Sequence, residues 1–136
     1  MKHLEVVCAL IINDDNEIFI CKRGKGVLSG KWEFPGGKIE PSENKEHAIV
    51  REIKEELTAS IEIIAYLGSS SYEYSDLDKP FSITMYGFLA RLVKGNLILL
   101  EHTDAAWVKY SDFDKYDFAA ADIELIKNIR NSQLLD

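Results

Sequence analysis

Apolar runs alternate with polar breaks over the first forty residues, which predicts short strands. Residues Leu4 to Ile12 are apolar at both even and odd positions, as in a strand that is covered on both faces. The turn-forming run 13–16 separates this strand from another over Glu17 to Lys22, so the two predict a hairpin. A short extended segment over Trp32 to Phe34 ends where the sequence Pro-Gly-Gly breaks it.

Two later segments have the apolar spacing of helices. From Asn44 to Leu57, isoleucine and leucine recur at every fourth position and give one core-facing stripe. A second amphipathic helix is predicted over Ala120 to Asn131, with Ile123, Leu125, Ile126 and Ile129 as its apolar positions. Strands are predicted between them over Ile61–Leu67, Ser70–Tyr74, Phe81–Val93 and Ala105–Val108. This order predicts an α/β fold in which a mixed β-sheet is sandwiched between α-helices.

Composition limits the classes of protein that fit this pattern. A chain of 136 residues, 46% of them hydrophobic, is expected to form a single domain over residues 1–136. The net charge of −7 argues against a nucleic-acid polymer as partner, so a phosphorylated ligand would need a metal or a local basic cluster. Cys8 and Cys21 lie in apolar runs, and no signal peptide or membrane span is evident, so we expect a cytoplasmic protein that contacts no membrane.

Three glutamates stand out in the first predicted helix. Glu52, Glu55 and Glu56 are spaced i, i+3 and i+4, which places three mutually repelling carboxylates on one helix face. Clustered hard oxygen ligands suit magnesium, with manganese as the alternative. The other interpretation is a solvated acidic face offset by Arg51 and Lys54. The preceding Pro-Gly-Gly, which exposes backbone carbonyls and amides, favours the metal site.

These residues carry a resemblance to a known family. Gly37, five residues, Glu43, seven residues and then the run Arg51–Glu56 match the Nudix box, and the segment 30–40 resembles the MutT-type nucleotide pyrophosphohydrolases. The resemblance implies a Nudix fold and magnesium-dependent hydrolysis of a nucleoside triphosphate to a monophosphate and pyrophosphate. The chain departs from the box at Thr58, where glycine is usual, and at the small Ala59. Because a β-branched residue resists the left-handed conformation, we expect the helix to end by another route or to run on.

The resemblance also implies site residues. Metals would be held by the carbonyl of Gly36 and by Glu52, Glu55 and Glu56, with Glu101, six residues before Trp107, as a further carboxylate. Glu52 is the first candidate for the general base and Glu101 the second, although Glu101 could be a solvated loop acid. Arg51 would orient the glutamates.

Three further residues are candidates for substrate binding. Arg23 and Lys38 would contact the phosphates, although each could be a surface charge. Asp122 would read the base, or serve as a first-turn acid of the last helix. The sequence does not decide whether the preferred base is cytosine, as in CTP or dCTP, or oxidised guanine. Four aromatic residues could stack on a base: Phe34, Tyr72, Tyr86 and Trp107. Because aromatic residues in strands more often pack in the core, we do not include them in the site.

Two alternatives to this function remain. One is a Nudix hydrolase of another nucleoside diphosphate derivative such as ADP-ribose, and the other is a non-catalytic nucleotide-binding module. The complete set of box glutamates argues against the module. His102 adjoins Glu101 and could lie near the nucleotide, but the histidines and cysteines lack a zinc spacing. We expect a monomer or a weak dimer.

Overall fold

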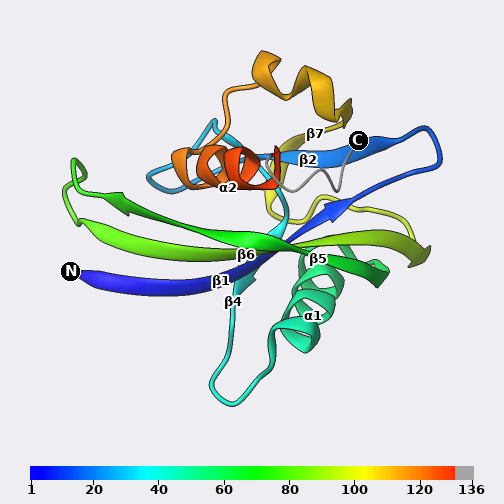
Figure 1. Cartoon of the computed structure of the whole chain (residues 1–136), viewed down its shortest axis with the longest axis horizontal. Coiled ribbons are helices and arrows are strands. Elements are labelled where there is room, and N and C mark those ends of the chain that lie inside the picture. Colours follow the sequence, from blue (N-terminus) through cyan, green and yellow to red (C-terminus); the bar gives the residue numbers. More distant parts are fainter. Residues whose placement is uncertain (131–136) are drawn as a thin grey trace.

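The computed structural model describes residues 1–130, which form two β-sheets and two α-helices (Figure 1). The elements are β1 (Lys2–Ile11), β2 (Glu17–Arg23), β3 (Trp32–Glu33), β4 (Gly36–Lys38), α1 (Lys45–Leu57), β5 (Ser60–Tyr74), β6 (Phe81–Lys94), β7 (His102–Lys109), the 3-10 helix η1 (Tyr110–Lys115) and α2 (Ala120–Arg130). One sheet has the order β4-β1-β6-β5 and the other β3-β2-β7. Because β1 runs parallel to β6 and antiparallel to β4, the first sheet is mixed.

The four-stranded sheet lies between α1 on one face and α2 on the other (Figure 1). Residues at odd positions between Val7 and Ile11 pack in a core with α1, whereas those at even positions between Val6 and Leu10 pack in a core with α2. Burial of each aliphatic side chain stabilises the folded state by about 1.5–3 kcal/mol relative to leaving it exposed. The apolar run therefore reflects two cores that share one strand, and the prediction of a mixed sheet between helices is confirmed.

Two predictions about strands need correction. The expected hairpin of β1 and β2 exists only at its turn, where the Asn13 amide donates to Glu17 O at 3.0 Å and Ile12 bridges Ile18. Beyond the turn the strands enter different sheets, because β4 and β6 occupy both edges of β1. The two strands predicted over residues 61–74 are a single strand, β5, whose register shifts absorb Gly68 at φ 128°.

The end of α1 contradicts our expectation for Thr58. Thr58 does adopt the left-handed conformation, with φ 58° and ψ 27°, and its amide donates to Lys54 O at 3.1 Å. Its hydroxyl also donates to Asn96 O at 3.3 Å, and the Ile98 amide donates to Leu57 O at 2.9 Å. Contacts with the segment that follows β6 thus offset the strain that glycine would have avoided.

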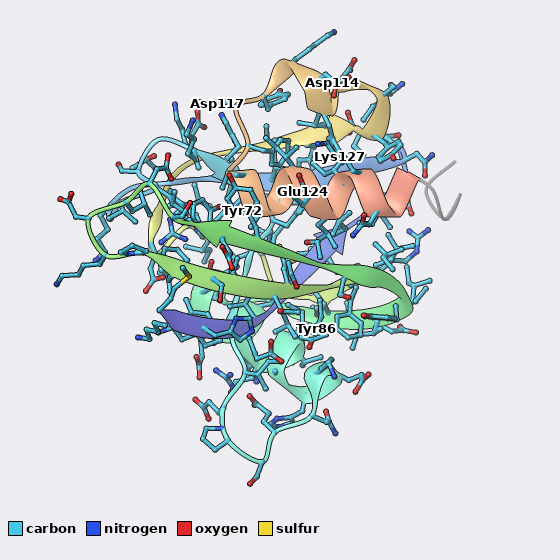
Figure 2. All side chains as sticks on the ribbon, turned by 60° about the vertical axis from the view of Figure 1, so that its left-hand side comes forward. Tyr72, Tyr86, Asp114, Asp117, Glu124 and Lys127 are labelled. Carbon is cyan, nitrogen blue, oxygen red and sulfur yellow. The ribbon has the colours of Figure 1, made fainter. Side chains whose placement is uncertain are left out.

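Helix α2 is amphipathic, as predicted, although one of its predicted apolar positions is not in the core. Leu125 and Ile129 are buried, whereas Ile123 is exposed. Glu124 and Lys127 lie on the exposed side of the helix (Figure 2), 3.4 Å apart. The predicted last residue, Asn131, lies outside the described residues. Within residues 1–130 no helix is long and apolar enough to cross a membrane.

Candidate active site

The apolar face of α1 packs in the core, so its acidic residues lie on the other faces of the helix. The Asn44 side chain caps the first turn, and Ile49 and Ile53 are fully buried against β1. This orientation leaves Glu52 and Glu56, one turn apart, beside the glycines of β4. Helix periodicity and core packing together place these two carboxylates.

A cleft of about 340 Å³ lies between this helix face, β4 and the start of β7. Its walls are Arg23, Gly24, Lys25, Glu33, Gly36, Gly37, Lys38, Glu52, Glu56, Glu101 and His102. Six predicted site residues thus come from four distant parts of the sequence to one place: Arg23, Gly36, Lys38, Glu52, Glu56 and Glu101. Glu55 and Asp122 do not line it.

The guanidinium of Arg51 connects Glu43, Glu52 and Glu55. Its Nη1 donates to Glu52 Oε1 at 2.9 Å and to Glu55 Oε2 at 3.1 Å, while its Nε donates to Glu43 Oε2 at 2.7 Å. Glu55 is 61% exposed and lies outside the cleft, linked to Glu52 through this guanidinium. The geometry supports the expectation that Arg51 orients box glutamates.

The ion pair between Arg51 and Glu43 predicts an acid-dependent contribution to stability. Hydrogen bonds from Arg51 lower the pKa of Glu43 from 4.5 to about 2. A lowered pKa in the folded state stabilises the fold above pH 4.5, and that stabilisation disappears as the pH falls towards about 2. Glu43→Gln should therefore reduce the free energy of unfolding in urea at pH 7, and by progressively less below pH 4.5. An equal reduction at all pH values would contradict this account.

Two carboxyl groups of the cleft, those of Glu56 and Glu52, have raised pKa values. Burial, and then the charges of Glu33, Glu52 and Glu101, raise the pKa of Glu56 to about 8. Burial likewise raises the pKa of Glu52, although hydrogen bonds from Arg51 oppose the shift. A cluster of buried acids that repel one another gains most from a cation placed among them.

The donor types in the cleft fit a hard divalent cation. Glu52, Glu56 and Glu101 offer carboxylate oxygens, and Gly36 offers a backbone carbonyl in the same walls. Oxygen ligands of this kind suit magnesium or manganese rather than zinc or copper. Such an ion would bind by a few carboxylates and leave coordination positions for water and a phosphate.

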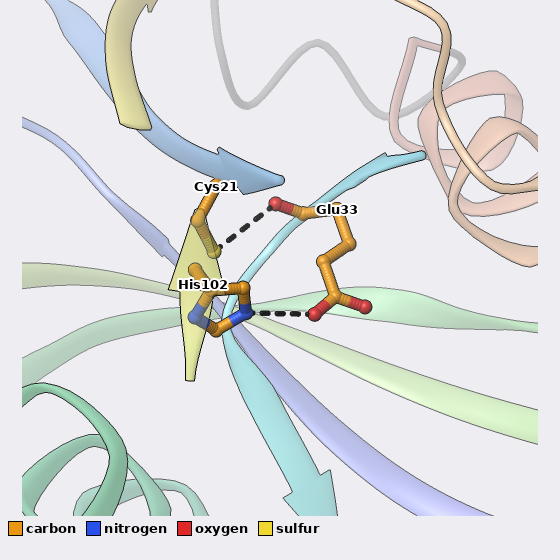
Figure 3. Close-up of side chains that lie close together, drawn as sticks. All are labelled: Cys21, Glu33 and His102. Atoms are coloured by element: carbon orange, nitrogen blue, oxygen red, sulfur yellow. Dashed lines mark hydrogen bonds and ion pairs between the residues drawn. The ribbon is translucent and has the colours of Figure 1, made fainter. Parts of the chain in front are cut away.

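Glu33 and His102, which are outside our predicted site, also line the cleft. His102 Nε2 lies 2.9 Å from Glu33 Oε2 (Figure 3). It also lies 3.3 Å from Glu56 Oε1, and Arg23 Nη1 donates to Glu33 Oε1 at 3.0 Å. Glu33 lies in the short strand β3, where the local sequence has no acidic pattern. The position of His102 beside Glu101 was the one available signal for its role.

Cys21 lies beside Glu33 and His102, and it is buried. Ligand atoms of Cys21, Glu33 and His102 all lie within 4.8 Å of one another. The thiol donates to the Glu33 carbonyl at 3.6 Å, and burial raises its pKa well above 9.0 (Figure 3). The sulfur therefore packs as a neutral group behind the cleft, as expected of a buried cysteine.

A second cavity of about 260 Å³ adjoins the cleft, and Arg23, Glu33, Gly37 and Lys38 line both. Asp122 lines this second cavity, and its side chain is buried, with 2% of the residue exposed. Its Oδ2 accepts a hydrogen bond from the Phe34 amide at 3.0 Å, and burial raises its pKa well above 3.8. The remaining walls are mostly apolar: Leu4, Val6, Val27, Leu28, Tyr74, Phe81, Ile83, Met85, Ala119 and Ala121.

The four aromatic residues set aside as core candidates line neither cavity. Phe34 is buried, and Tyr72 and Tyr86 are partly buried against the two cores. Trp107 differs because it is exposed on β7 and packs edge-on against Phe19 at 5.4 Å. A planar ligand in the second cavity would therefore contact aliphatic side chains, Tyr74 and Phe81.

Comparisons with known proteins agree with this geometry. The model of the NUDIX domain family matches residues 1–129. The chain is 32% identical to a CTP pyrophosphohydrolase of Escherichia coli over 93% of this chain and 91% of that protein, and 31% identical to an 8-oxo-dGTP diphosphatase of the same organism over 96% and 98%. The solution structure of the E. coli ORF135 protein superimposes with a TM-score of 0.78 at 32% identity, covering 100% of this chain and 96% of that one.

Proposed function

Because the chain belongs to the Nudix family of hydrolases, we propose that it cleaves a nucleoside triphosphate, of the CTP/dCTP type or oxidised dGTP, to a monophosphate and pyrophosphate. The cofactor in this proposal is magnesium, with manganese as the alternative. One observation carries it: a carboxylate cleft opens beside a largely apolar cavity that contains a buried acid, and two basic residues border both. The two cavities match the charged and the planar parts of a nucleotide.

The cation would be held by Glu52, Glu56, Glu101 and the Gly36 carbonyl. Glu55 is the remaining candidate ligand, and its link to Glu52 through Arg51 keeps it close to the metal site. When bound, the metal supplies charge neutralisation for the triphosphate and polarises the phosphorus that reacts.

A carboxylate must remove a proton from the attacking water, and Glu52 is our first candidate. Its pKa is raised by burial, which makes it a better base near neutral pH than an ordinary glutamate. Arg51 holds its other side through Glu52 Oε1, so the carboxylate has a fixed direction. Glu101, in the same walls, is the second candidate.

Arg23 and Lys38 would bind the phosphate chain between the two cavities. Arg23 is already held by Glu33 through Nη1, which fixes the guanidinium at the boundary. Lys38 is exposed in β4 and borders the same two spaces. Their charges would offset the acidic character of the chain where a triphosphate approaches.

Asp122 would select the base, which predicts a change in discrimination when it is replaced. Its Oδ2 accepts from the Phe34 amide, and the carboxyl retains further acceptor capacity for a base edge. Asp122→Ala should lower kcat/KM for the preferred triphosphate about a hundredfold, because a polar site loses its partner. Steady-state kinetics on cytosine and guanine triphosphates would measure it.

Asp122→Asn is the matched control for folding, since its amide oxygen can still accept from the Phe34 amide. It should remain as stable as the wild type but shift the preference among bases. If both variants kept the wild-type ratio of kcat/KM values between bases, Asp122 would not read the base.

The proposed function is tested with magnesium and a panel of triphosphates in water labelled with oxygen-18. The panel contains CTP, dCTP, dGTP, 8-oxo-dGTP and ATP, with ADP-ribose as the substrate of the alternative enzyme class. Chromatography and mass spectrometry identify products and the position of the label. Monophosphate and pyrophosphate from one triphosphate support the proposal, and the labelled product identifies which phosphorus was attacked.

Two other outcomes would each replace the proposal. Cleavage of ADP-ribose without turnover of any triphosphate would indicate a different Nudix substrate. Binding of nucleotides without any product would indicate the non-catalytic module.

A further inference from the structure

Glu56 differs from the other acids of α1 in how it is held. Arg51 lies within 3.6 Å of carboxylate oxygens of Glu40, Glu43, Glu52 and Glu55. Glu56 lines the cleft beside Glu52, with 9% of the residue exposed, and no ion pair with Arg51 is found for it among the described residues. The box arginine therefore cannot be the group that orients this carboxylate.

The polar side chain that the described residues bring to Glu56 is His102. Its Nε2 lies 3.3 Å from Glu56 Oε1, and its side chain is only 4% exposed. The same nitrogen makes a hydrogen bond with Glu33 Oε2 at 2.9 Å, so one ring atom contacts both acids. The other ring nitrogen, Nδ1, is buried and has no hydrogen-bond partner among residues 1–130, so the ring makes its polar contacts through Nε2.

The orientation of the His102 ring is fixed by Glu33, which Arg23 holds in turn. Glu33 Oε2 forms a hydrogen bond with Nε2 at 2.9 Å (Figure 3), and Arg23 Nη1 donates to the other Glu33 oxygen at 3.0 Å. Pairing of Cys21 with Glu33 between β2 and β3 fixes the backbone of this acid. The imidazole thus has one orientation, in which Nε2 makes its hydrogen bond with Glu33 and lies 3.3 Å from Glu56 Oε1.

From this geometry we propose that His102, anchored by Glu33, is a positioning residue that orients Glu56 for cation binding. The inference rests on the proposed function, in which Glu56 is a metal ligand. A carboxylate whose rotation is already limited by a neighbouring polar side chain loses less rotational freedom when it binds a metal, and loss of such a partner typically costs tenfold to a hundredfold in metal affinity.

The test measures manganese affinity in the absence of nucleotide, by electron paramagnetic resonance, for three variants of the full chain. His102→Leu removes the N–H but fills the space, and should weaken manganese binding by about tenfold or more. His102→Gln places an amide N–H near the position of Nε2 and should restore most of the affinity. His3→Gln, whose side chain is exposed near the start of β1, is the control and should bind as the wild type does.

A double-mutant cycle shows whether His102 acts through Glu56. In a Glu56→Gln background, the further change His102→Leu should weaken manganese binding by less than twofold, because the group it orients is absent. At saturating magnesium the KM for the nucleotide should stay within about twofold of the wild type in His102→Leu. A purely structural role would instead lower the melting temperature of both His102 variants and leave metal affinity unchanged.

The outcomes separate this inference from the proposed function. If Glu56→Gln binds manganese as tightly as the wild type, the proposed metal site is wrong. If Glu56→Gln weakens binding but His102→Leu does not, the metal site stands and the positioning role is overturned. Equal affinity losses for His102→Leu with and without Glu56 would also overturn it.

Discussion

Glu56→Gln should lower magnesium-dependent turnover of the preferred triphosphate about a thousandfold, which corresponds to about 4 kcal/mol of transition-state stabilisation. The amide keeps the shape of the side chain but cannot supply a charged ligand to a cation. Because the pKa of Glu56 is raised to about 8 by burial and by neighbouring acids, the neutral amide should not destabilise the metal-free fold at pH 7. Kinetics at saturating substrate and a thermal melt without metal would measure the two effects.

Two further glutamates of the same helix provide graded controls. Glu46 is exposed in the first turn of α1, so Glu46→Gln should leave turnover unchanged. Glu55 lies outside the cleft and is 61% exposed, so Glu55→Gln should reduce turnover by much less than Glu56→Gln. Equal losses for Glu55 and Glu56 would mean that their positions in the cleft do not determine their contribution.

The parts of the fold that follow from local periodicity could be predicted from the sequence. Spacing of four between Ile49 and Ile53 identified the buried face of α1, and both residues are fully buried. The uninterrupted apolar run of β1 identified a strand covered on both faces. Such patterns are visible locally because each side chain responds to one core.

Features that depend on partners distant in sequence could not be predicted. The separation of β1 and β2 into two sheets depends on β4 and β6, which occupy both edges of β1. Thr58 adopts a left-handed conformation because Asn96 and Ile98 stabilise that turn from the segment after β6. The sequence around β1 gives no indication of β4 and β6 as its neighbours, and the sequence around Thr58 gives no indication of Asn96 and Ile98.

Some residues of the candidate site could likewise be predicted from the sequence, and others could not. The acidic face of α1 and the double glycine could be identified from spacing and from the resemblance to the Nudix box. The contacts of His102 with Glu33 and Glu56 could not, because they join β7, β3 and α1. Glu33 lines both the carboxylate cleft and the second cavity, and the amide of the next residue, Phe34, binds Asp122, so this short segment connects the two spaces.

The two adjacent glycines of β4 have different reasons to be glycine. A Cβ on Gly36 would collide with the backbone of Val7 and Cys8 in the paired strand β1. A Cβ on Gly37 would instead collide with the Glu52 carboxylate. The first contact involves backbone that cannot move without breaking the sheet, whereas the second involves the end of a flexible side chain.

Gly37→Ala should therefore lower turnover at least a hundredfold while changing the free energy of unfolding by less than about 1 kcal/mol. The methyl group fits only if Glu52 turns away, which moves the candidate base from the cleft and breaks its alignment with Arg51. Gly36→Ala should show the opposite balance, with a large loss of stability that follows from displaced β1 backbone. Urea unfolding and initial rates on the same preparations separate the two. If Gly37→Ala retained full turnover, the carboxylate of Glu52 would not need its present position, and Glu101 would become the first candidate for the base.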